Sequence, residues 1–426
     1  MPGSIAAQEA EAAARRSYGR LLAWLAWQWR DIAAAEDALA EAFAIALERW
    51  PVDGVPSAPD AWLLTTARRE LLMAARRQRL AEDPALTVLH PREDAIAPDP
   101  QAIPDSRLRL MFVCAHPAID PAVRSALMLQ TVLGLDSGRI ASAFLVKPEA
   151  MGKRLVRAKA KIKATGIRFE EPEAADWPER LDAVLEAIYG AYTLHWGQAD
   201  DDGGHQLATE ASYLAELAAS LLPDEPEAAG LAALLWLCEA RRPARIDARG
   251  AFVPLDEQDT RRWDHALIAR AHAALAHAAT LRRPGAYQLE AAVQAAHVQG
   301  ALVGHVPWGD IAGLYDWLLA HAPTLGARIG HAVALAHARD DAAAGLALLD
   351  GIEPARVTAH QPWWAARARL LALAHAHEAA AAAYGRALAL TAEPALRDWL
   401  ALRIEEQRAA AALRARDCQV GHRPVG

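Results

Sequence analysis

The chain has 426 residues and a formal net charge of −8 at pH 7, which argues against a protein that coats nucleic acid over its whole surface. Its three cysteines lie far apart without metal-ligand spacing, so we expect no disulfide framework and a reducing, cytoplasmic location. No apolar run approaches about 20 residues and no signal peptide is visible, so no membrane segment is expected.

The composition predicts an all-α protein. Ala and Leu are abundant, β-branched residues are sparse, and few stretches alternate with a period of two residues. At this length the chain is expected to hold roughly three domains.

Three helices are predicted in the first 80 residues. The first covers residues 5–30, and Asp31 can cap the second, which runs to Trp50. The second helix has an expected core stripe of Ile32, Leu39, Phe43, Leu47 and Trp50. Its outer surface is acidic and carries Glu36, Asp37, Glu41 and Glu48. A third helix starts near Pro59 and ends in a basic tail, so two surfaces of opposite charge are expected.

Residues 81–106 are predicted to be extended or disordered. They contain five prolines, almost no periodicity, and six acidic residues against one arginine. A plain solvated tether and a segment with its own binding role are both compatible with this composition.

A helix-turn-helix is predicted between Leu133 and Lys163. Asp136 can cap a short first helix, and Pro148 suits the first turn of a second one. The second helix has an apolar stripe of Met151, Leu155, Ala158 and Ile162. Its other faces are basic, with seven Lys or Arg against one Glu. Proteins that read the DNA major groove use this arrangement; a solvated basic helix is the alternative interpretation.

Several of these stretches resemble the extracytoplasmic-function (ECF) group of bacterial sigma-70-type sigma factors. Residues 35–43 (AEDALAEAF) and 61–68 (AWLLTTAR) look like conserved region two, and residues 154–159 (RLVRAK) are similar to region four. Residues 111–117 (MFVCAHP) resemble the opening of region four in a subgroup with a long helical extension. The sigma-like resemblance covers roughly residues 10–168.

The resemblance implies an all-α chain with two small helical sigma domains, the second a helix-turn-helix, joined by a linker and followed by a repeat-like domain. The expected boundaries are 1–80 for the region 2-like domain, 81–106 for the acidic Pro-rich linker and 107–168 for the region 4-like domain. The C-terminal extension, resembling tetratricopeptide repeats (TPR-like), would occupy residues 177–426. In the family the linker threads the path later taken by nascent RNA.

The resemblance further implies a non-enzymatic role in transcription initiation, with core RNA polymerase and promoter DNA as partners and a nucleoid-associated location. Core polymerase would bind the acidic helix through Glu36, Asp37, Glu41, Phe43 and Glu48. The promoter −10 element would meet Thr65, Thr66, Arg68, Arg69, Arg76 and Arg77. The −35 element would meet Lys147, Lys153, Arg154, Arg157 and Lys161.

Two positions of the expected −10 helix depart from the family. Relatives carry an Asn shortly after the Ala-Arg pair and an Asp four residues later, where this chain has Arg69 and Met73. We therefore do not carry over the promoter preference of relatives, and weaker strand opening is expected. In the same helix, Thr65 and Thr66 either contact DNA or bond back to helix carbonyls, and Trp62 is favoured as a core residue over a base-stacking one.

From Trp177 onward the sequence predicts successive amphipathic helices. Trp364, Ala380, Tyr384 and Ala387 have the separations of a tetratricopeptide repeat, and Arg328–Leu349 is a looser helix pair. Such pairs stack into a solenoid whose concave face binds proteins or peptides, so a partner of that kind is expected.

Residues 241–263 break this pattern and predict a two-stranded excursion or an ordered loop. Their charged groups form either a ligand pocket or, as we favour, a salt-bridge network. The sixteen histidines form no metal-binding motif, and no nucleophile elbow, P-loop or dinucleotide fingerprint is present. The sequence therefore predicts no metal, cofactor or active site.

Two other functions are compatible with parts of the sequence. A stand-alone helix-turn-helix regulator with a helical-repeat sensor domain would need no polymerase-binding helix and would dimerise on a palindromic site. A soluble enzyme would have its pocket near residues 245–259. The sigma factor hypothesis is favoured because it explains both N-terminal motifs and their order.

Overall fold

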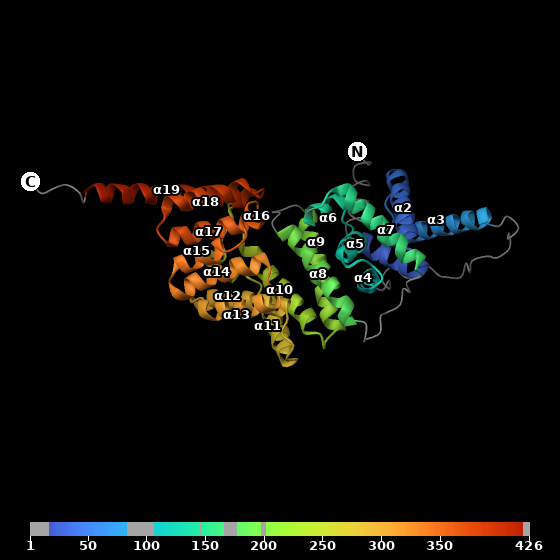
Figure 1. The fold of residues 1–426 in the computed structure, drawn as a ribbon. Helices are drawn as coiled ribbons and strands as arrows, with labels where there is room; N and C mark the ends of the chain where they lie inside the picture. The colour runs from blue at the N-terminus through green and yellow to red at the C-terminus, as the bar shows by residue number, and fades with distance from the viewer. Residues whose placement is uncertain (1–16, 83–105, 145, 166–176, 197–201, 421–426) are drawn as a thin grey trace, which may run out of the picture. The chain divides into compact units, whose positions relative to one another are not determined.

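The structure is a computed structural model that describes residues 17–82, 106–144, 146–165, 177–196 and 202–420 (Figure 1). The described residues form helices and no extended sheet, which confirms the all-α prediction. Contacts divide the chain into two units. Unit 1 comprises Met1–Trp196 and Asp201–Leu214, and unit 2 comprises Gly197–Asp200 and Ala215–Gly426. The predicted linker lies almost wholly outside the described residues.

Unit 1 begins with a helical segment at residues 17–29, followed by α2 (Ile32–Asp53) and α3 (Pro59–Glu82). Asp31 caps α2 by accepting a hydrogen bond from the Ala34 N–H at 3.1 Å. The predicted end at Trp50 is wrong by about a turn. The helix continues to Gly54, which adopts φ +87° and donates its N–H to the Trp50 carbonyl at 3.0 Å.

The remaining helices of the expected sigma module are α4 (Arg107–Cys114), α5 (Pro121–Thr131), α6 (Ser137–Ala143) and α7 (Pro148–Ala164). Helices α6 and α7 lie where the helix-turn-helix is predicted, and Pro148 occupies the first turn of α7. All four residues of the predicted stripe on α7 are buried. Because α7 packs against both α5 and α6, this stripe holds the basic helix on the body of unit 1.

Helices α8 (Trp177–Trp196) and α9 (Asp202–Leu221) follow, and α8 packs against α4 and α5. Ser125 on α5 donates a hydrogen bond to Glu186 on α8 at 3.0 Å. Arg107 on α4 pairs with Glu210 on α9 and lies over the ring of Tyr213. Residues 177–196 and most of α9 therefore share unit 1 with the sigma-like helices.

Unit 2 is a succession of helices in which neighbours in sequence pack against each other (Figure 1). They are α10 (Pro226–Arg241), α11 (His265–Thr280), α12 (Ala286–Val303), α13 (Trp308–His321), α14 (Leu325–Arg339), α15 (Ala342–Asp350), α16 (Pro354–Val357), α17 (Gln361–Leu373), α18 (His377–Ala389) and α19 (Pro394–Val420). Gly230 lets α10 approach α12 closely, because a Cβ there would lie 2.6 Å from the backbone nitrogen of Gln288.

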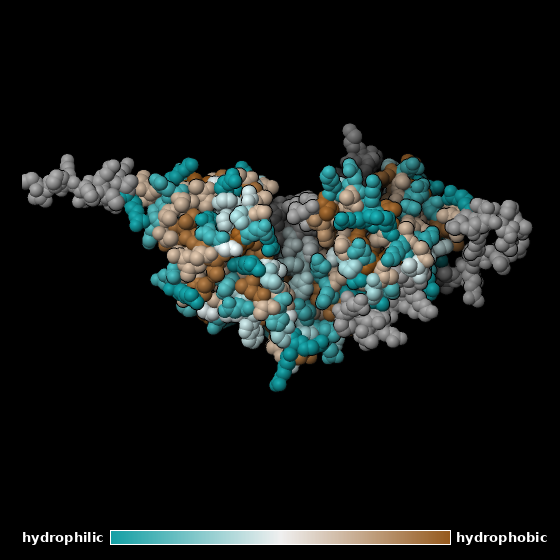
Figure 2. Space-filling model, in the orientation of Figure 1, coloured by the Kyte–Doolittle hydropathy of each residue, from teal (hydrophilic) through white to brown (hydrophobic). Residues whose placement is uncertain are grey.

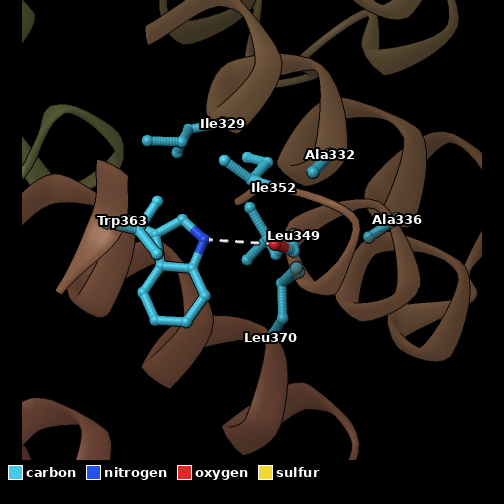
Figure 3. Packing of buried hydrophobic residues seen from close by; sticks show 8 residues of the cluster. Ile329, Ala332, Ala336, Leu349, Ile352, Trp363 and Leu370 are labelled. Atoms are coloured by element: carbon cyan, nitrogen blue, oxygen red, sulfur yellow. Dashed lines mark hydrogen bonds between the residues drawn. The ribbon is translucent and has the colours of Figure 1, made fainter. Parts of the chain in front are cut away.

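One core cluster of unit 2 joins α14, α15 and α17. Trp363 belongs to this cluster together with Ile329, Ile352 and Leu370, and it donates its indole N–H to the Leu349 carbonyl at 3.3 Å (Figure 3). The indole therefore fills the space between three helices and also satisfies its only polar atom.

Residues 242–264, which we call the strap, connect α10 to α11. The strap contains three short 3-10 helices (η3, Arg242–Ala244; η4, Leu255–Glu257; η5, Thr260–Arg262) and a single antiparallel bridge between Ile246 and Phe252. This matches the ordered-loop alternative of the prediction better than the two-stranded one.

Ion pairs and an aromatic contact fix the strap against the last helices of unit 2. Its ion pairs are Arg245–Glu393 at 3.2 Å, Asp256–Arg369 at 3.2 Å and Glu257–Arg403 at 3.5 Å. The ring of Phe252 lies edge-on to Trp399, with centroids 5.8 Å apart. The groups that suggested a pocket or a salt-bridge network thus contact partners more than 100 residues away in sequence.

Because of His297 on α12, we expect the free energy of unfolding of unit 2 to depend on pH. Its ring lies 5.4 Å from that of Trp308, and burial, followed by the charges of Arg241 and Arg369, lowers its pKa to about 4. The folded state therefore prefers the neutral imidazole. This contribution to stability is complete above the ordinary pKa of about 6.5 and is lost as the pH falls towards 4, a change of at most about 3 kcal/mol.

The expected result is that His297→Phe weakens the loss of stability between pH 7 and pH 4, measured by urea unfolding. His265→Phe, at an exposed position of α11, is the matched control and should leave the pH dependence as it is in the natural chain. Equal pH dependence in the His297 variant and the natural chain would contradict the assignment.

Candidate functional site

The exposed face of α2 combines carboxylates with apolar side chains. Asp37, Glu41 and Glu48 are exposed, and Ala40, Ala44, Leu47 and Val52 share their side of the helix. Leu47 is 50% exposed and Val52 84% exposed. The prediction that Leu47 lies in the core is wrong. Four of the seven buried positions of α2 are alanines, so its buried side is not the side with the most large apolar residues. The buried residues are Ile32, Ala35, Ala38, Leu39, Ala42, Ala46 and Trp50. The face suits a partner that is both basic and partly apolar.

Two residues of the predicted polymerase-binding set are not on this open face. Phe43 is half-buried and stacks on Tyr18, with ring centroids 6.5 Å apart. The Glu36 carboxylate pairs with the Lys159 ammonium of α7 at 2.5 Å, and only 18% of its side chain is exposed. Burial raises the pKa of Glu36, and the hydrogen bond from Lys159 opposes that shift. Burial also raises the pKa of Tyr18, with Glu36 and Asp37 adding to the effect.

The second face lies on α3 and is basic. Arg69, Met73, Arg76 and Arg77 are exposed, and helical spacing places them on the same side as Thr65 and Thr66. Both threonine hydroxyls donate to carbonyls of their own helix, Thr65 to Ala61 at 2.8 Å and Thr66 to Trp62 at 2.9 Å. Arg68 is half-buried. The face also carries a large apolar side chain, Met73, which is 46% exposed.

The first turn of α3 is fixed by contacts to neighbouring elements. The Asp60 carboxylate accepts hydrogen bonds from Ser17 at 2.9 Å and Arg20 at 2.6 Å. Trp62 is half-buried and packs edge-on against Trp50 at 5.6 Å, so its ring is engaged with α2. The α3 face is therefore held in a fixed orientation relative to α2.

The third face is the basic surface of α7. The side chains of Lys147, Lys153, Arg154, Arg157 and Lys161 are all exposed and lie outside the buried stripe. Hydrophilic side chains gather over α7 on the face drawn in Figure 2. All five side chains predicted to reach the −35 element are thus open to solvent on one helix.

The sequence prediction missed the role of the remaining lysines of α7. Lys159 and Lys163 are four residues apart and face α2, where they pair with Glu36 and Asp31. Their spacing indicates a shared helix face, but nothing in the sequence identifies the acidic partners, which lie more than 120 residues away.

Unit 1 also contains a buried free cysteine. Cys114 is buried 3.6 Å from the Thr131 hydroxyl, and burial raises the pKa of its thiol to about 12. In the part of the chain that the structure describes, no group of three or more His, Cys, Asp or Glu side chains could hold a metal ion. None of the described helices is long and apolar enough to cross a membrane.

Comparisons with known proteins agree with this arrangement. Residues 14–81, which include α2 and α3, match the family Sigma-70 region 2. Residues 180–279 match a Family of unknown function (DUF6596). An uncharacterized protein of Rhizobium meliloti (strain 1021) is 38% identical over 330 residues, which are 76% of this chain and 78% of the relative. No solved structure matches the chain.

Proposed function

Because the chain belongs to the family of sigma-70-type factors that carry a region 2 domain and a C-terminal helical extension, we propose that it is an alternative sigma factor of the ECF type. It binds core RNA polymerase and directs it to the −10 and −35 elements of a promoter. The observation that carries this proposal is the exposed acidic and apolar face of α2, which lies inside the region 2 match and beside the basic face of α3.

Core polymerase docks on α2 through Asp37, Glu41 and Glu48. The exposed side chains of Leu47 and Val52 add apolar area at the same face, and burying such area supplies affinity that rim charges alone do not. Glu36 and Phe43 act indirectly, since both hold α2 against other parts of unit 1.

The −10 element meets the α3 face. Arg69, Arg76 and Arg77 contact phosphates, and Met73 offers an apolar surface to an unstacked base. Thr65 and Thr66 already donate to their own helix, so they take part as acceptors. With Arg69 and Met73 in place of the family's Asn and Asp, we propose a −10 preference that differs from that of relatives.

The −35 element meets α7, with α6 and α7 acting as a helix-turn-helix. Lys147, Lys153, Arg154, Arg157 and Lys161 extend from the exposed side of α7, and side chains near the start of such a helix reach base edges. Because most Lys and Arg contacts go to phosphates, this domain supplies affinity and register more than sequence preference.

The C-terminal extension is proposed to be a TPR-like regulatory region that acts on the sigma module. The residues with repeat spacing support this, since Ala380 is buried, and Tyr384 and Ala387 are buried in a cluster that Trp364 also packs against. We propose domains at residues 1–80, 107–168 and 177–426, with a linker at 81–106. Within the last of these ranges, α8 and the part of α9 up to Leu214 pack with the sigma-like helices of unit 1. A protein or peptide partner would bind the extension.

The proposal is tested by co-elution of the purified chain with bacterial core RNA polymerase on size exclusion. We expect the natural chain to co-elute and Asp37→Arg/Glu41→Arg to do so at least tenfold less, because two charges then repel a basic partner surface. The matched control is Asp182→Arg/Asp398→Arg, which reverses two exposed carboxylates on α8 and α19 and should co-elute normally.

Failure of the folded natural chain to associate with core polymerase would contradict the sigma factor proposal. In that case the exposed basic face of α7 would favour the stand-alone DNA-binding regulator. Dimerisation on a palindromic duplex would then be the next measurement.

A further inference from the structure

The strap crosses a face of unit 2 to which alternate helices contribute. The Asp256 carboxylate pairs with an arginine of α17, and the Glu257 carboxylate pairs with one of α19. The charge of Asp256 also acts on the pKa of one histidine on α12 and one on α14. In helical-repeat arrays, partners bind on an extended face built from successive repeats. We call this surface the strap face, and its side chains are His297, His337, Arg369, Trp399 and Arg403.

The strap is anchored at its two ends and not in its middle. Near the ends, Ala244 and Trp263 are buried, at 1% and 4% exposure. Residues 245–262 between them are all half-buried or exposed. The side chains of Asp256 and Glu257 are 51% and 55% exposed, so solvent screens both ion pairs and each adds little to stability. The middle of the strap can therefore leave the strap face while its ends stay in place.

The strap satisfies the polar atoms of this face only in part. The Trp399 indole N–H and the Arg403 Nε–H are buried and, among the residues that the structure describes, donate to no acceptor. Phe252 and Glu257 lie against the same two side chains, but neither accepts a hydrogen bond from these atoms. The buried Nε2 atom of His337 has no partner within the described part of the chain either. Because buried polar atoms without partners cost free energy, a ligand that supplies acceptors here has an advantage over the strap.

The charge of the strap face favours an acidic ligand. Arg369 and Arg403 carry fixed positive charges, and Glu406 pairs with Arg403 at 3.0 Å. Burial lowers the pKa of both histidines of the face, so they are neutral at pH 7 and serve as hydrogen-bonding groups. The strap itself shows the fitting pattern, since its aromatic Phe252 is followed, after three residues, by two adjacent carboxylates.

We propose that the strap face is a binding site for an acidic peptide segment of a partner protein, and that the strap is a tethered occupant which this segment displaces. The inference rests on the proposed role of the extension as a partner-binding region and does not depend on polymerase. A tethered occupant competes at a high effective concentration, so only a segment with better contacts displaces it. Its binding releases residues 245–262, and the extension thereby reports the partner through a change in its own structure.

The experiment uses the full chain and, as the probe, a fluorescently labelled peptide with the sequence of residues 250–260. Fluorescence anisotropy measures its binding. The variant Asp256→Asn/Glu257→Gln, which we call the opened variant, loses both ion pairs of the strap with the face. We expect it to bind the peptide about tenfold more tightly than the natural chain, where the intact strap competes. Asp259→Asn is the control within the strap, because this carboxylate pairs with the nearby Arg261, and it should bind like the natural chain.

Two further changes locate the binding site. Arg369→Glu/Arg403→Glu in the opened variant should weaken binding at least about tenfold, because two attractions become repulsions. Arg328→Glu/Arg339→Glu is its matched control, since both arginines are exposed and lie on the side of α14 opposite His337. A peptide with Asn and Gln at its positions 256 and 257 should bind the opened variant equally weakly, and this comparison leaves the protein unchanged. Circular dichroism confirms that each variant is folded.

Hydrogen exchange read by mass spectrometry follows the strap itself. In the natural chain the Val253 N–H donates to the Arg245 carbonyl at 2.8 Å. An excess of the peptide should make the strap amides exchange faster, because the displaced strap loses such hydrogen bonds. The amides of α13 should exchange at an unchanged rate.

Three results would overturn the inference: no binding of the peptide to the opened variant, equal binding after Arg369→Glu/Arg403→Glu, or peptide binding without faster exchange of the strap. Displacement of the strap by a single-stranded oligonucleotide but not by the peptide would overturn it as well, because the face would then bind phosphates. A chain that binds the peptide here and never associates with core polymerase would instead contradict the sigma factor proposal and leave this inference standing.

Discussion

A chain that ends at residue 176 is expected to lose the folded state of α4–α7, whereas a chain that ends at residue 222 is expected to keep it. The reason is that α8 covers α4 and α5. Its large apolar side chains Leu181, Val184, Leu185, Ile188 and Tyr192 are at most 3% exposed. At about 1.5–3 kcal/mol for each buried side chain, their removal costs on the order of 10 kcal/mol, comparable with the whole stability of a small domain.

Thermal unfolding of the two truncated chains, followed by circular dichroism, is the measurement. The longer chain should show a cooperative transition, and the shorter one should bind a hydrophobic dye and lack cooperative unfolding of the region 4-like helices. A cooperative transition of these helices in the chain that ends at residue 176 would contradict this role of α8. It follows that a transcription assay of the extension needs the cut after α9, because a cut at residue 177 removes part of the sigma module.

Replacement of Trp363 by Ala is expected to destabilise unit 2 by about 3–5 kcal/mol. Trp363 is 7% exposed and is the largest side chain of the cluster in Figure 3, so the substitution leaves a cavity between α14, α15 and α17 and removes the hydrogen bond to Leu349. The matched control is Trp317→Ala on α13, because that indole is 62% exposed and its loss should cost less than about 0.5 kcal/mol.

Hydrogen exchange read by mass spectrometry separates this effect from the behaviour of unit 1. Amides of α15 and α17 should exchange roughly a thousandfold faster in the Trp363 variant, while those of α2 and α3 stay unchanged. Similar exchange in the Trp363 and Trp317 variants would contradict the contribution assigned to Trp363 in this cluster.

Much of the local structure follows from sequence alone. Asp31 sets the start of α2 and Pro148 that of α7, and the apolar spacing of α7 identifies its buried stripe. These features are predictable because each depends only on residues within a few turns of each other. The end of α2 and the exposure of Leu47 were not predicted correctly. The buried side of that helix is lined largely by alanines, so the positions of its large apolar side chains do not show which side is buried. Hydrophobic patterning identifies a helix face reliably only when that face carries the larger residues.

The relations between distant segments could not be read from the sequence. The amphipathic pattern of α8 shows that one face is buried, but the partner could equally be the next helix of the extension or the sigma module. Likewise, any of the seven cations near α7 could pair with an acidic residue elsewhere, and the choice of Lys159 and Lys163 follows from the packing of α7 against α2 in the folded chain. All five predicted −35 residues were placed on one exposed face because that depends on helix geometry alone.

The strap has a consequence for how the chain folds during synthesis. In an ordinary helical-repeat array each unit contacts its neighbours only, so folding can follow the emerging chain step by step. Here the contacts of Asp256 with Arg369 and of Glu257 with Arg403 connect segments more than 100 residues apart. The ribosome must therefore release α19 before unit 2 can complete its structure, which makes its assembly slower and more cooperative than that of a simple array. Unit 1 also has contacts of this sequence separation, between Lys159 and Glu36 and between Arg107 and Glu210. Its last residues belong to α9, so unit 1 can be folded while the second half of the protein is still being translated.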